Sequence, residues 1–347
     1  MNKTFVRILS FIFLLLTAGI LYAGPNQWTL TAGMNRPAFY ISLSPVDNKV
    51  LFCTVGSGHV PLALYRSNDK GNTWSQVTQN DNAYWSYVFC SPASTSIVFM
   101  PDSKGLNRSI NGGYTMSLVT SGLADGDRVT DMAYVNDQNK TIFVNSYSIY
   151  ESTDGGNTWS PASTGMGYLS GIHLSASPVN SSLIYATGGN GLYKSIDKGE
   201  NWSLLTTMTN SWRRICVNPS NPSNVYAIPL YQSYLYKSHD GGVTWGLITA
   251  GISSSLTVLD IDCDANDSTQ IFLSTSNGYF KSSDSGDTWQ PMNEGLSSTP
   301  PSAEDILVIP GKSPIILAAT PFGVYSYTLT STSVEKEKWE MFEEKKY

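Results

Sequence analysis

The sequence has few charged residues, and this scarcity limits the partners that it can bind. Only 14% of its 347 residues are Asp, Glu, Lys or Arg, and the formal net charge is −6. Nucleic-acid binding requires Lys and Arg side chains that neutralise phosphates, and the body of the chain has no basic run. We therefore expect no nucleic-acid partner. An acidic surface also favours solubility and gives no attraction to anionic membranes.

Long apolar runs are missing after residue 23. Before that point, Lys3 and Arg7 precede the apolar run 8–20, and Ala23 is a small residue suited to the position before a cleavage. This order is typical of a secretory signal peptide, and the run is short for a membrane span. We expect residues 1–23 to be removed and the protein to be exported to the periplasm, cell surface or extracellular space, without a membrane span. An uncleaved N-terminal anchor is the alternative.

Several motifs of enzymes and cofactor-binding proteins are also missing. The sequence has no phosphate-binding loop, no Cys/His spacing typical of a metal site and no Gly-x-Ser-x-Gly motif. His173 and His239 have no histidine or cysteine partner nearby in the sequence. We therefore expect neither a cofactor nor a metal.

What the chain has in abundance is an internal repeat. The octapeptide S-x-D-x-G-x-x-W occurs five times, and a sixth, worn copy has Asn in place of Asp and Met in place of Trp. Successive copies are 42, 43, 43, 43 and 44 residues apart and begin at Ser67, Ser109, Ser152, Ser195, Ser238 and Ser282. A regular period in this range indicates a repeat architecture.

Each repeat contains four short segments with the composition of strands. In the fourth repeat these are residues 171–178, 183–187, 192–195 and 202–205, and a Gly/Asn turn separates the second from the third. Four short strands in about 43 residues are the pattern of one β-propeller blade.

The first segments can be aligned on the proline that ends them or on its substitute. Four places before that residue stand only apolar residues: Ile41, Val88, Ala133, Leu174, Ile215, Ile261 and Ile306. Two places before it stand Leu43, Cys90, Val135, Ala176, Val217, Cys263 and Val308, which are again all apolar. A period of two is typical of a strand, and the seven rows predict seven blades.

The last row has no fourth segment of its own. It has strand patterns at 305–309, 315–320 and 323–328, and the repeat then stops. Segment 24–34 matches segment 156–166 in its Trp and in the Gly-Met that follows. We expect this N-terminal strand to complete the last blade and close the ring, which removes the open sheet edges.

The predicted fold is therefore all-β: a seven-bladed β-propeller of four-stranded antiparallel blades over residues 24–330, in one domain and as a monomer. Residues 331–347 form a charged tail, which we expect to be a short helix or a disordered end. A docking role for Trp339 and Phe342 in that tail is the alternative.

The chain has only four cysteines. Cys90 and Cys263 occupy the same column in distant repeats, Cys216 is one place off and faces the other side of its strand, and Cys53 lies on a different strand. We interpret all four as small buried apolar residues. Disulfides are the alternative in an exported protein.

Stability alone explains every part of the octapeptide. Its Ser and Asp can accept hydrogen bonds from nearby amides, its Gly allows a positive φ, and its Trp begins the next strand and packs over the turn. We interpret the following residues as structural: Asp69, Asp154, Asp197, Asp240, Asp284, Trp74, Trp159, Trp202, Trp245 and Trp289. A catalytic or metal-binding role for the aspartates is the alternative.

This octapeptide resembles the Asp-box (BNR) repeat, and the copies cover nearly the whole chain after residue 23. The resemblance implies a β-propeller whose boxes lie at the blade periphery, away from the ligand-binding face. Related propellers include sialidases, xyloglucan-type glycoside hydrolases, the sortilin family and a photosystem II assembly factor.

The sequence departs from each of these relatives. It lacks the sialidase arginine triad, since Arg36-Pro37 has no intervening Ile and Arg213 and Arg214 are the only other plausible pair. It has one propeller where the xyloglucan hydrolases have two, and none of the cysteine-rich modules of sortilins. The assembly factor matches in blade number and export signal, although its arginine-rich patch is not evident.

Propeller ligands commonly bind at the mouth of the central channel, where each first strand begins. Five places before the turn residue stand Tyr40, Tyr87, Met132, His173, Arg214, Asp260 and Asp305. One place earlier stand Phe39, Ser86, Asp131, Ile172, Arg213, Leu259 and Glu304, and Trp85 and Trp212 precede this column. We predict ligand contacts from Tyr40, Tyr87, Trp85, His173, Trp212, Arg213 and Arg214.

These columns permit two functions. Aromatic and charged side chains around a cup suit a glycan or a protein ligand, so we expect a binding or assembly module. The alternative is a glycoside hydrolase, in which two of Asp131, Asp260, Glu304 and Asp305 act as acid and base. In a third, purely structural interpretation, Arg213 and Arg214 neutralise the acids and tie the ring together.

Overall fold

The structure, a computed structural model, consists of strands and turns, and no helix occurs among the residues that it describes. The predicted signal peptide, the tail 331–347 and Trp85 lie outside the described residues. Those residues are 26–56, 62–80, 87–102, 104–123, 129–137, 142–145, 148–166, 173–188, 191–206 and 211–330. None of their segments is a helix long and apolar enough to cross a membrane.

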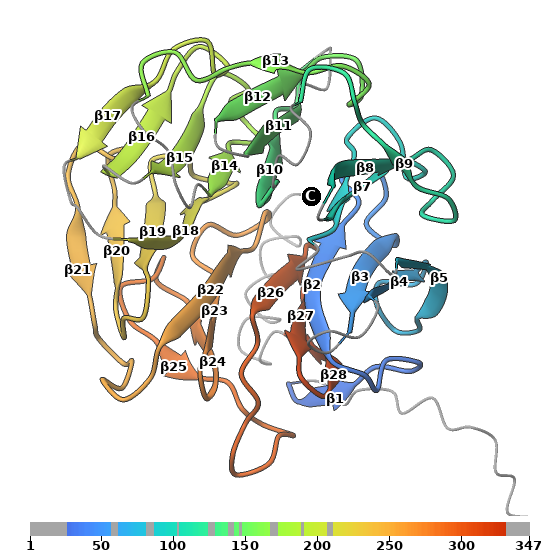
Figure 1. Ribbon diagram of the computed structural model, residues 1–347. Coiled ribbons are helices and arrows are strands. Elements are labelled where there is room, and N and C mark those ends of the chain that lie inside the picture. Colours follow the sequence, from blue (N-terminus) through green and yellow to red (C-terminus); the bar gives the residue numbers. More distant parts are fainter. Residues whose placement is uncertain are drawn as a thin grey trace, which may run out of the picture.

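The strands form four-stranded antiparallel sheets that are arranged as blades around a central axis (Figure 1). Blade 1 contains β2 (Ala38–Leu43), β3 (Leu51–Val55), β4 (Leu62–Ser67) and β5 (Ser75–Asn80). Blade 2 contains β6 (Phe89–Cys90), β7 (Val98–Asp102), β8 (Gly105–Ser109) and β9 (Ser117–Leu118). Blade 3 contains β10 (Asp131–Tyr134), β11 (Ile142–Asn145), β12 (Ile149–Ser152) and β13 (Ser160–Pro161).

The same order continues around the ring. Blade 4 contains β14 (Leu174–Ala176), β15 (Ile184–Gly188), β16 (Gly191–Ser195) and β17 (Ser203–Thr206). Blade 5 contains β18 (Trp212–Val217), β19 (Val225–Pro229), β20 (Leu235–Ser238) and β21 (Gly246–Ile248). Blade 6 contains β22 (Val258–Cys263), β23 (Ile271–Thr275), β24 (Gly278–Ser282) and β25 (Gln290–Pro291).

Six blades are continuous segments of the chain, and each carries one octapeptide between its third and fourth strands. One further four-stranded sheet, called blade 7 below, is composite and has no octapeptide. Its order is β1-β28-β27-β26, built from β26 (Asp305–Ile309), β27 (Ile315–Thr320), β28 (Gly323–Thr328) and the N-terminal β1 (Trp28–Leu30).

β1 occupies the place of an outermost strand in this composite sheet. It pairs antiparallel with β28 in the register Trp28↔Tyr327. The Trp28 amide donates to the Glu294 carbonyl at 2.7 Å, as the amide of the box residue Trp202 donates to the Thr164 carbonyl at 2.9 Å. The predicted ring closure by the N-terminal strand is thus present in the structure.

The alignment of inner strands needs one correction, in blade 3. In blade 6, Cys263 pairs with Ile271, which pairs with the box residue Ser282. In blade 3, Tyr134 takes the place of Cys263, because it pairs with Ile142, which pairs with the box residue Ser152. The turn residue of blade 3 is therefore Asn136, one place earlier than the spacing suggested. Blade 3 has no turn proline, so the sequence offered no fixed point for its alignment.

Positions in the inner strands are numbered below as −5 to −2, counted back from the turn residue. With the correction, Met132 rather than Ala133 occupies position −4 of blade 3, and Asp131 occupies position −5. Side chains at positions −4 and −2 face the preceding blade, as Ile261 and Cys263 do when they pack with Tyr226 and Ile228 of blade 5. Positions −5 and −3 face the channel and the following blade.

The octapeptides form closed turns. In the box of blade 3, the Asp154 carboxylate accepts hydrogen bonds from the Ser152 hydroxyl at 2.8 Å and from the Thr158 amide at 3.0 Å. Desolvation of the Asp154 carboxylate would raise its pKa, but these hydrogen bonds outweigh that effect and lower the pKa to about 2. In the worn box, Asn111 makes the same two contacts at 2.9 and 3.0 Å. The turn therefore needs the oxygen of this side chain and not its charge.

Each box also packs against the preceding blade through its conserved glycine, the fifth residue of the octapeptide. A Cβ on Gly156 would lie 2.3 Å from the ring of Phe99, and one on Gly199 would lie 2.6 Å from the ring of Phe143. The same place in the other four boxes abuts side chains of the preceding blade: Leu317, Leu64, Leu205 and Tyr226. The box is therefore a blade-to-blade joint as well as a turn.

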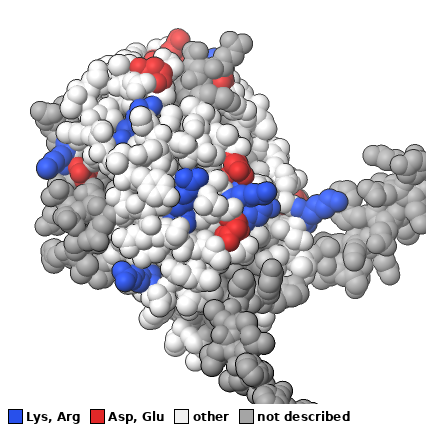
Figure 2. All heavy atoms as spheres, turned by 90° about the vertical axis from the view of Figure 1, so that its right-hand side faces the viewer, with Lys and Arg blue, Asp and Glu red and all other residues white. Residues whose placement is uncertain are grey.

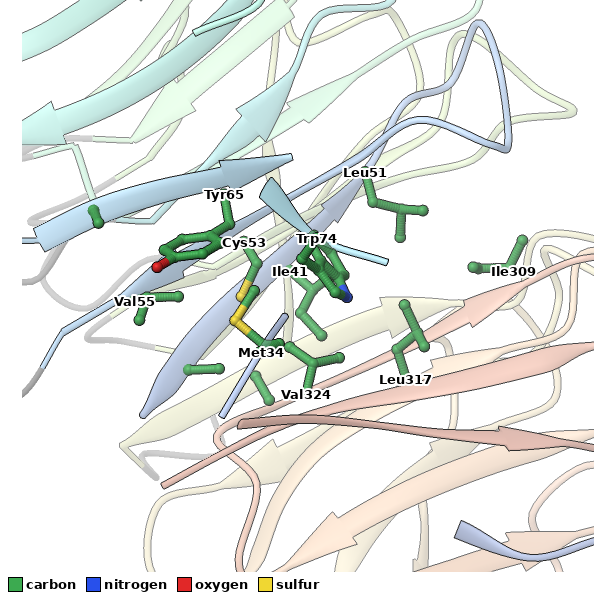
Figure 3. Close-up of a cluster of buried hydrophobic side chains, with 13 residues drawn as sticks. Met34, Ile41, Leu51, Cys53, Val55, Tyr65, Trp74, Ile309, Leu317 and Val324 are labelled. Carbon is green, nitrogen blue, oxygen red and sulfur yellow. The ribbon is translucent and has the colours of Figure 1, made fainter. Parts of the chain in front are cut away.

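Hydrophobic clusters fill the spaces between blades. The cluster in Figure 3 joins blade 1 to blade 7, because Ile41, Leu51 and Trp74 pack there with Ile309 and Leu317. Burying such a side chain contributes about 1.5–3 kcal/mol. The contact between the first and last blades therefore stabilises the closed ring.

The joint at Gly156 predicts a difference between two neighbouring glycines. Gly155 and Gly156 both have positive φ, 72° and 81°, but a Cβ on Gly155 would meet only the Arg108 guanidinium, at 3.8 Å. We expect Gly156→Ala to lower the free energy of unfolding by about 1–3 kcal/mol more than Gly155→Ala, through overpacking against Phe99. Urea denaturation of both variants measures this difference. Equal losses would mean that only the strained φ matters.

Candidate functional site

The seven residues at position −5 form a ring around the channel, one from each blade. They are Tyr40, Tyr87, Asp131, His173, Arg214, Asp260 and Asp305, with Asp131 in place of the expected Met132. Inner strands have one edge without a partner strand, so their backbone amides need other acceptors. The polar groups of this ring supply several of those acceptors.

Three carboxylates of the ring each accept a hydrogen bond from the following blade. Asp131 Oδ2 accepts from the Leu174 amide at 2.9 Å. Asp260 Oδ2 accepts from the Ile306 amide at 3.0 Å, and Asp305 Oδ2 accepts from the Ile41 amide at 2.7 Å. All three donors stand at position −4 of the next blade, so each acid connects two neighbouring inner strands.

Arg214 lies between two of these acids. Its Nε is 2.5 Å from Asp260 Oδ1, and its terminal nitrogen is 3.1 Å from Asp305 Oδ1. Burial raises the pKa of Asp305 well above its usual range, the Asp260 charge adds to this, and Arg214 opposes it. Burial alone would lower the pKa of Arg214, but the surrounding carboxylates hold it above its ordinary value. The three groups form one buried network that spans blades 5, 6 and 7.

A second, more exposed pair lies next to this network. Arg213 forms an ion pair with Glu304, whose side chain is 50% exposed, and its Nε donates to the Leu259 carbonyl at 2.5 Å. Arg213 is the extra residue of a β-bulge, because Trp212 pairs with Pro229 and Arg214 with Ile228. The predicted pairing of the two arginines with Asp260, Glu304 and Asp305 is thus what the structure contains.

The opposite side of the ring is aromatic. The Tyr40 and Tyr87 rings have centroids 4.0 Å apart, and Tyr87 stacks on Phe89 at 5.9 Å. Burial raises the pKa of both tyrosines. A cavity of about 230 Å³ opens between these rings, Asp131, Arg214, Asp305 and the apolar side chains of the inner strands of blades 1, 2 and 7. This cavity is called the channel cavity below.

The remaining predicted site residues lie in different surroundings. His173 Nδ1 is 3.4 Å from Asp131 Oδ2, its neighbour in the ring. Trp212 is only 4% exposed and packs among Leu192, Ile215 and Ala227, so it belongs to the core between blades 4 and 5 and not to a channel wall. The bulge at Arg213 turns the Trp212 side chain away from the channel.

The structure adds a set of residues that sequence reasoning did not identify, at position −3. Ser42 Oγ accepts from the Cys90 amide at 3.1 Å, and Ser175 Oγ accepts from the Val217 amide at 2.9 Å. Asp262 Oδ2 accepts from the Val308 amide at 2.7 Å, and burial raises the pKa of Asp262 to about 7. The sequence did contain a signal for these residues. Strands have a period of two, and position −3 therefore lies on the same face as position −5.

Charge is sparse on one side of the ring. Figure 2 shows the side of the ring where β5 and β9 lie, and its Lys, Arg, Asp and Glu side chains are few and scattered. Within the described part of the chain, no three His, Cys, Asp or Glu side chains lie close enough together to hold a metal ion. The site is therefore a small cavity with an aromatic side and a neutralised ionic side.

The comparisons with known proteins agree on the fold. The sequence model of the Sortilin-Vps10 family, described as sortilin, neurotensin receptor 3, matches residues 190–315. No curated protein sequence matches the chain at a significant level. Similar solved structures are numerous, but those reported below share less than 25% identity with the chain, so they bear on the fold alone.

Three of these structures illustrate the range. YCF48 bound to D1 peptide is 17% identical with a TM-score of 0.63, and the alignment covers 90% of this chain and 99% of that one. The GH74 enzyme of Niastella koreensis is 22% identical with a TM-score of 0.59, and the alignment covers 83% of this chain and 51% of the enzyme. An inactive virginiamycin B lyase from Staphylococcus aureus, solved with quinupristin, is 12% identical with a TM-score of 0.63 and coverages of 88% and 99%.

Removing Arg214 tests the buried network. We expect Arg214→Met to lower the free energy of unfolding by about 3–5 kcal/mol at pH 8, because Asp260 and Asp305 lose their cation in a buried place. Arg214 opposes the raised pKa of Asp305, so its removal raises that pKa further, and the folded variant binds a proton more tightly than the folded wild type does. The loss should therefore grow as pH rises and shrink toward pH 5.

Arg213→Met is the matched control, since its partner Glu304 is half exposed. Its cost should stay below about 1 kcal/mol and vary little with pH. Denaturant unfolding of both variants between pH 5 and pH 8 gives the comparison. A loss for Arg214→Met that is small or independent of pH would contradict the network.

Proposed function

The chain is a β-propeller of the Asp-box (BNR) type, and we propose that it is a non-catalytic binding or assembly module whose ligand enters the channel cavity. The proposal includes export, which the charged start and the apolar run of residues 1–23 support. The ligand that we propose is a segment of a partner protein. A glycan is the alternative ligand.

The observation that carries this proposal is the state of the channel acids. Asp131, Asp260 and Asp305 each accept a backbone amide of the next blade, and the latter two also contact Arg214. Glu304 is paired with Arg213. A glycosidase needs two carboxyls that face one open cleft and are free to exchange protons with substrate or water. The candidate acids are all engaged in holding the ring together.

The lining of the channel cavity favours a protein side chain over a sugar. Tyr40, Tyr87 and Phe89 provide aromatic surface, and Leu43 and Leu307 add aliphatic surface. The volume of about 230 Å³ is below the range of about 300–1,000 Å³ usual for small-molecule sites, so it suits one inserted side chain. A buried apolar or aromatic anchor in such a pocket is the common centre of a protein interface.

One structural relative supports the choice of a protein ligand. YCF48, which the alignment covers almost end to end, was solved with a D1 peptide. The GH74 enzyme, in contrast, is about twice as long as the aligned part, since this chain covers 51% of it. The likeness to the shorter, peptide-bound propeller is therefore the more complete of the two.

One observation favours the competing function of a glycoside hydrolase. The pKa of Asp305 is raised by burial and by Asp260, and a raised carboxyl pKa is a property that a general acid requires. Against this, the oxygens of Asp305 already contact the Ile41 amide and Arg214.

Binding and hydrolysis can be measured on the same protein. We expect a random peptide library displayed on phage to yield peptides with an apolar or aromatic anchor. Tyr87→Ala should weaken their binding at least about tenfold, because the aromatic side of the pocket is lost. Tyr114→Ala is the matched control, since Tyr114 is 59% exposed within the blade 2 box, and it should leave the affinity unchanged.

The hydrolase arm uses xyloglucan and a panel of other β-glucans as probes. We expect no release of reducing ends. Release that disappears in Asp305→Asn, measured on protein with an unchanged melting temperature, would replace the binding proposal with the enzyme. Peptides that bind Tyr87→Ala as well as the wild type would exclude the channel cavity as the binding place.

A further inference from the structure

Two free cysteines meet at one joint between inner strands. Cys216 at position −3 of blade 5 and Cys263 at position −2 of blade 6 have their sulfur atoms 3.8 Å apart, 47 residues apart in sequence. Position −3 faces the following blade and position −2 faces the preceding one. The two cysteines differ by one position in the alignment, and for this reason their side chains face each other across the joint. The other two, Cys53 and Cys90, lie in blades 1 and 2 and are also free.

The same pair of positions holds a hydrogen bond in other joints. Ser42 accepts the Cys90 amide, Ser175 accepts the Val217 amide, and Asp262 accepts the Val308 amide. At the joint between blades 5 and 6, the position −3 side chain is a thiol, which is a weak acceptor. The Cys263 amide instead donates to the side chain of the preceding residue, Asp262, at 2.8 Å. This joint therefore lacks the oxygen that links the inner strands at those three joints.

We propose that Cys216 and Cys263 are a redox-convertible pair that forms a disulfide between the inner strands of blades 5 and 6. A disulfide requires the sulfurs to approach to about 2.05 Å. The observed separation therefore leaves less than about 2 Å to be closed, which side-chain rotation at two neighbouring strands can supply. The bond replaces the missing hydrogen bond of this joint.

The oxidant that the step requires is a small-molecule disulfide such as oxidised glutathione. The Cys216 thiolate attacks one of its sulfurs, forms a mixed disulfide and releases one thiolate. The Cys263 thiolate then attacks Cys216 Sγ and releases the second. The two protons lost by the cysteines end on the two molecules of reduced glutathione, and the cysteine pair is oxidised by two electrons.

The order of attack follows from exposure. Cys216 is partly exposed, whereas Cys263 is 4% exposed. Contact with Cys216 and burial raise the pKa of Cys263, which makes this cysteine the poorer first nucleophile of the two. Cys216 is therefore the residue that meets the oxidant, and Cys263 resolves the mixed disulfide.

The test uses the full chain and oxidised glutathione. After reduction and removal of the reductant, the protein is oxidised, its remaining thiols are alkylated, and its peptides are mapped by mass spectrometry. We expect a cross-linked peptide that contains Cys216 and Cys263, alkylated Cys53 and Cys90, and reversal by dithiothreitol. The closed loop should also raise the melting temperature by several degrees.

Two variants sharpen the result. Cys216→Ser restores the hydroxyl that Ser42 provides at its own joint, so it should fold and show a melting temperature that does not depend on the oxidant. Ser42→Cys copies the sulfur pair at the joint with Cys90 and should yield a second cross-link there. Four alkylated cysteines in the oxidised wild type, or glutathione that stays on Cys216 without a cross-link, would overturn the proposal.

Discussion

The unpaired inner edges of the blades are the constraint on which the rest of the structure depends. In each blade the first strand faces the channel and has a partner strand on one side only, so its amides on the other side require acceptors. Asp131, Asp260 and Asp305 meet this need at position −5, and Ser42, Ser175 and Asp262 meet it at position −3. Each bond runs from one blade to the next, so the acceptors that satisfy the edge also bind the ring together.

The octapeptides solve the corresponding problem on the outside of the ring. Their Ser and Asp side chains close the turn between the third and fourth strands, and their glycines let the turn lie directly on the preceding blade. Blade 7 has no octapeptide, and there Trp28 packs instead on Tyr279 at 4.4 Å and donates to the Met292 carbonyl. The outer joints thus account for the two polar residues that recur in every octapeptide, the Ser and the Asp or Asn.

Much of the fold could be predicted from the sequence, because the repeat is local in the chain. The three strands of blade 7 have the bounds that the pattern indicated, 305–309, 315–320 and 323–328. Sequence spacing was less informative where a local irregularity intervenes. Because blade 3 lacks the turn proline, the alignment placed Asp131 one position too early. The bulge at Arg213 directs the Trp212 side chain into the core, whereas the alignment had placed it at the channel.

The role of the channel acids was harder to predict for a different reason. Whether a carboxylate is catalytic or structural depends on its partners, and these are backbone amides 43, 46 and 264 residues away in sequence. The same side chains at the same positions could equally have faced an open cleft. The sequence placed them at the channel mouth, but only the distance between neighbouring inner strands determines what they bind.

Amide hydrogen exchange at Leu174 tests this account most directly. If Asp131 is the acceptor that joins blades 3 and 4, the Leu174 amide should exchange slowly in the wild type and much faster in Asp131→Ala, while the Ile306 amide, held by Asp260, keeps its protection. Unchanged protection at Leu174, or a loss spread evenly over both amides, would contradict the account of the channel acids as joints between blades.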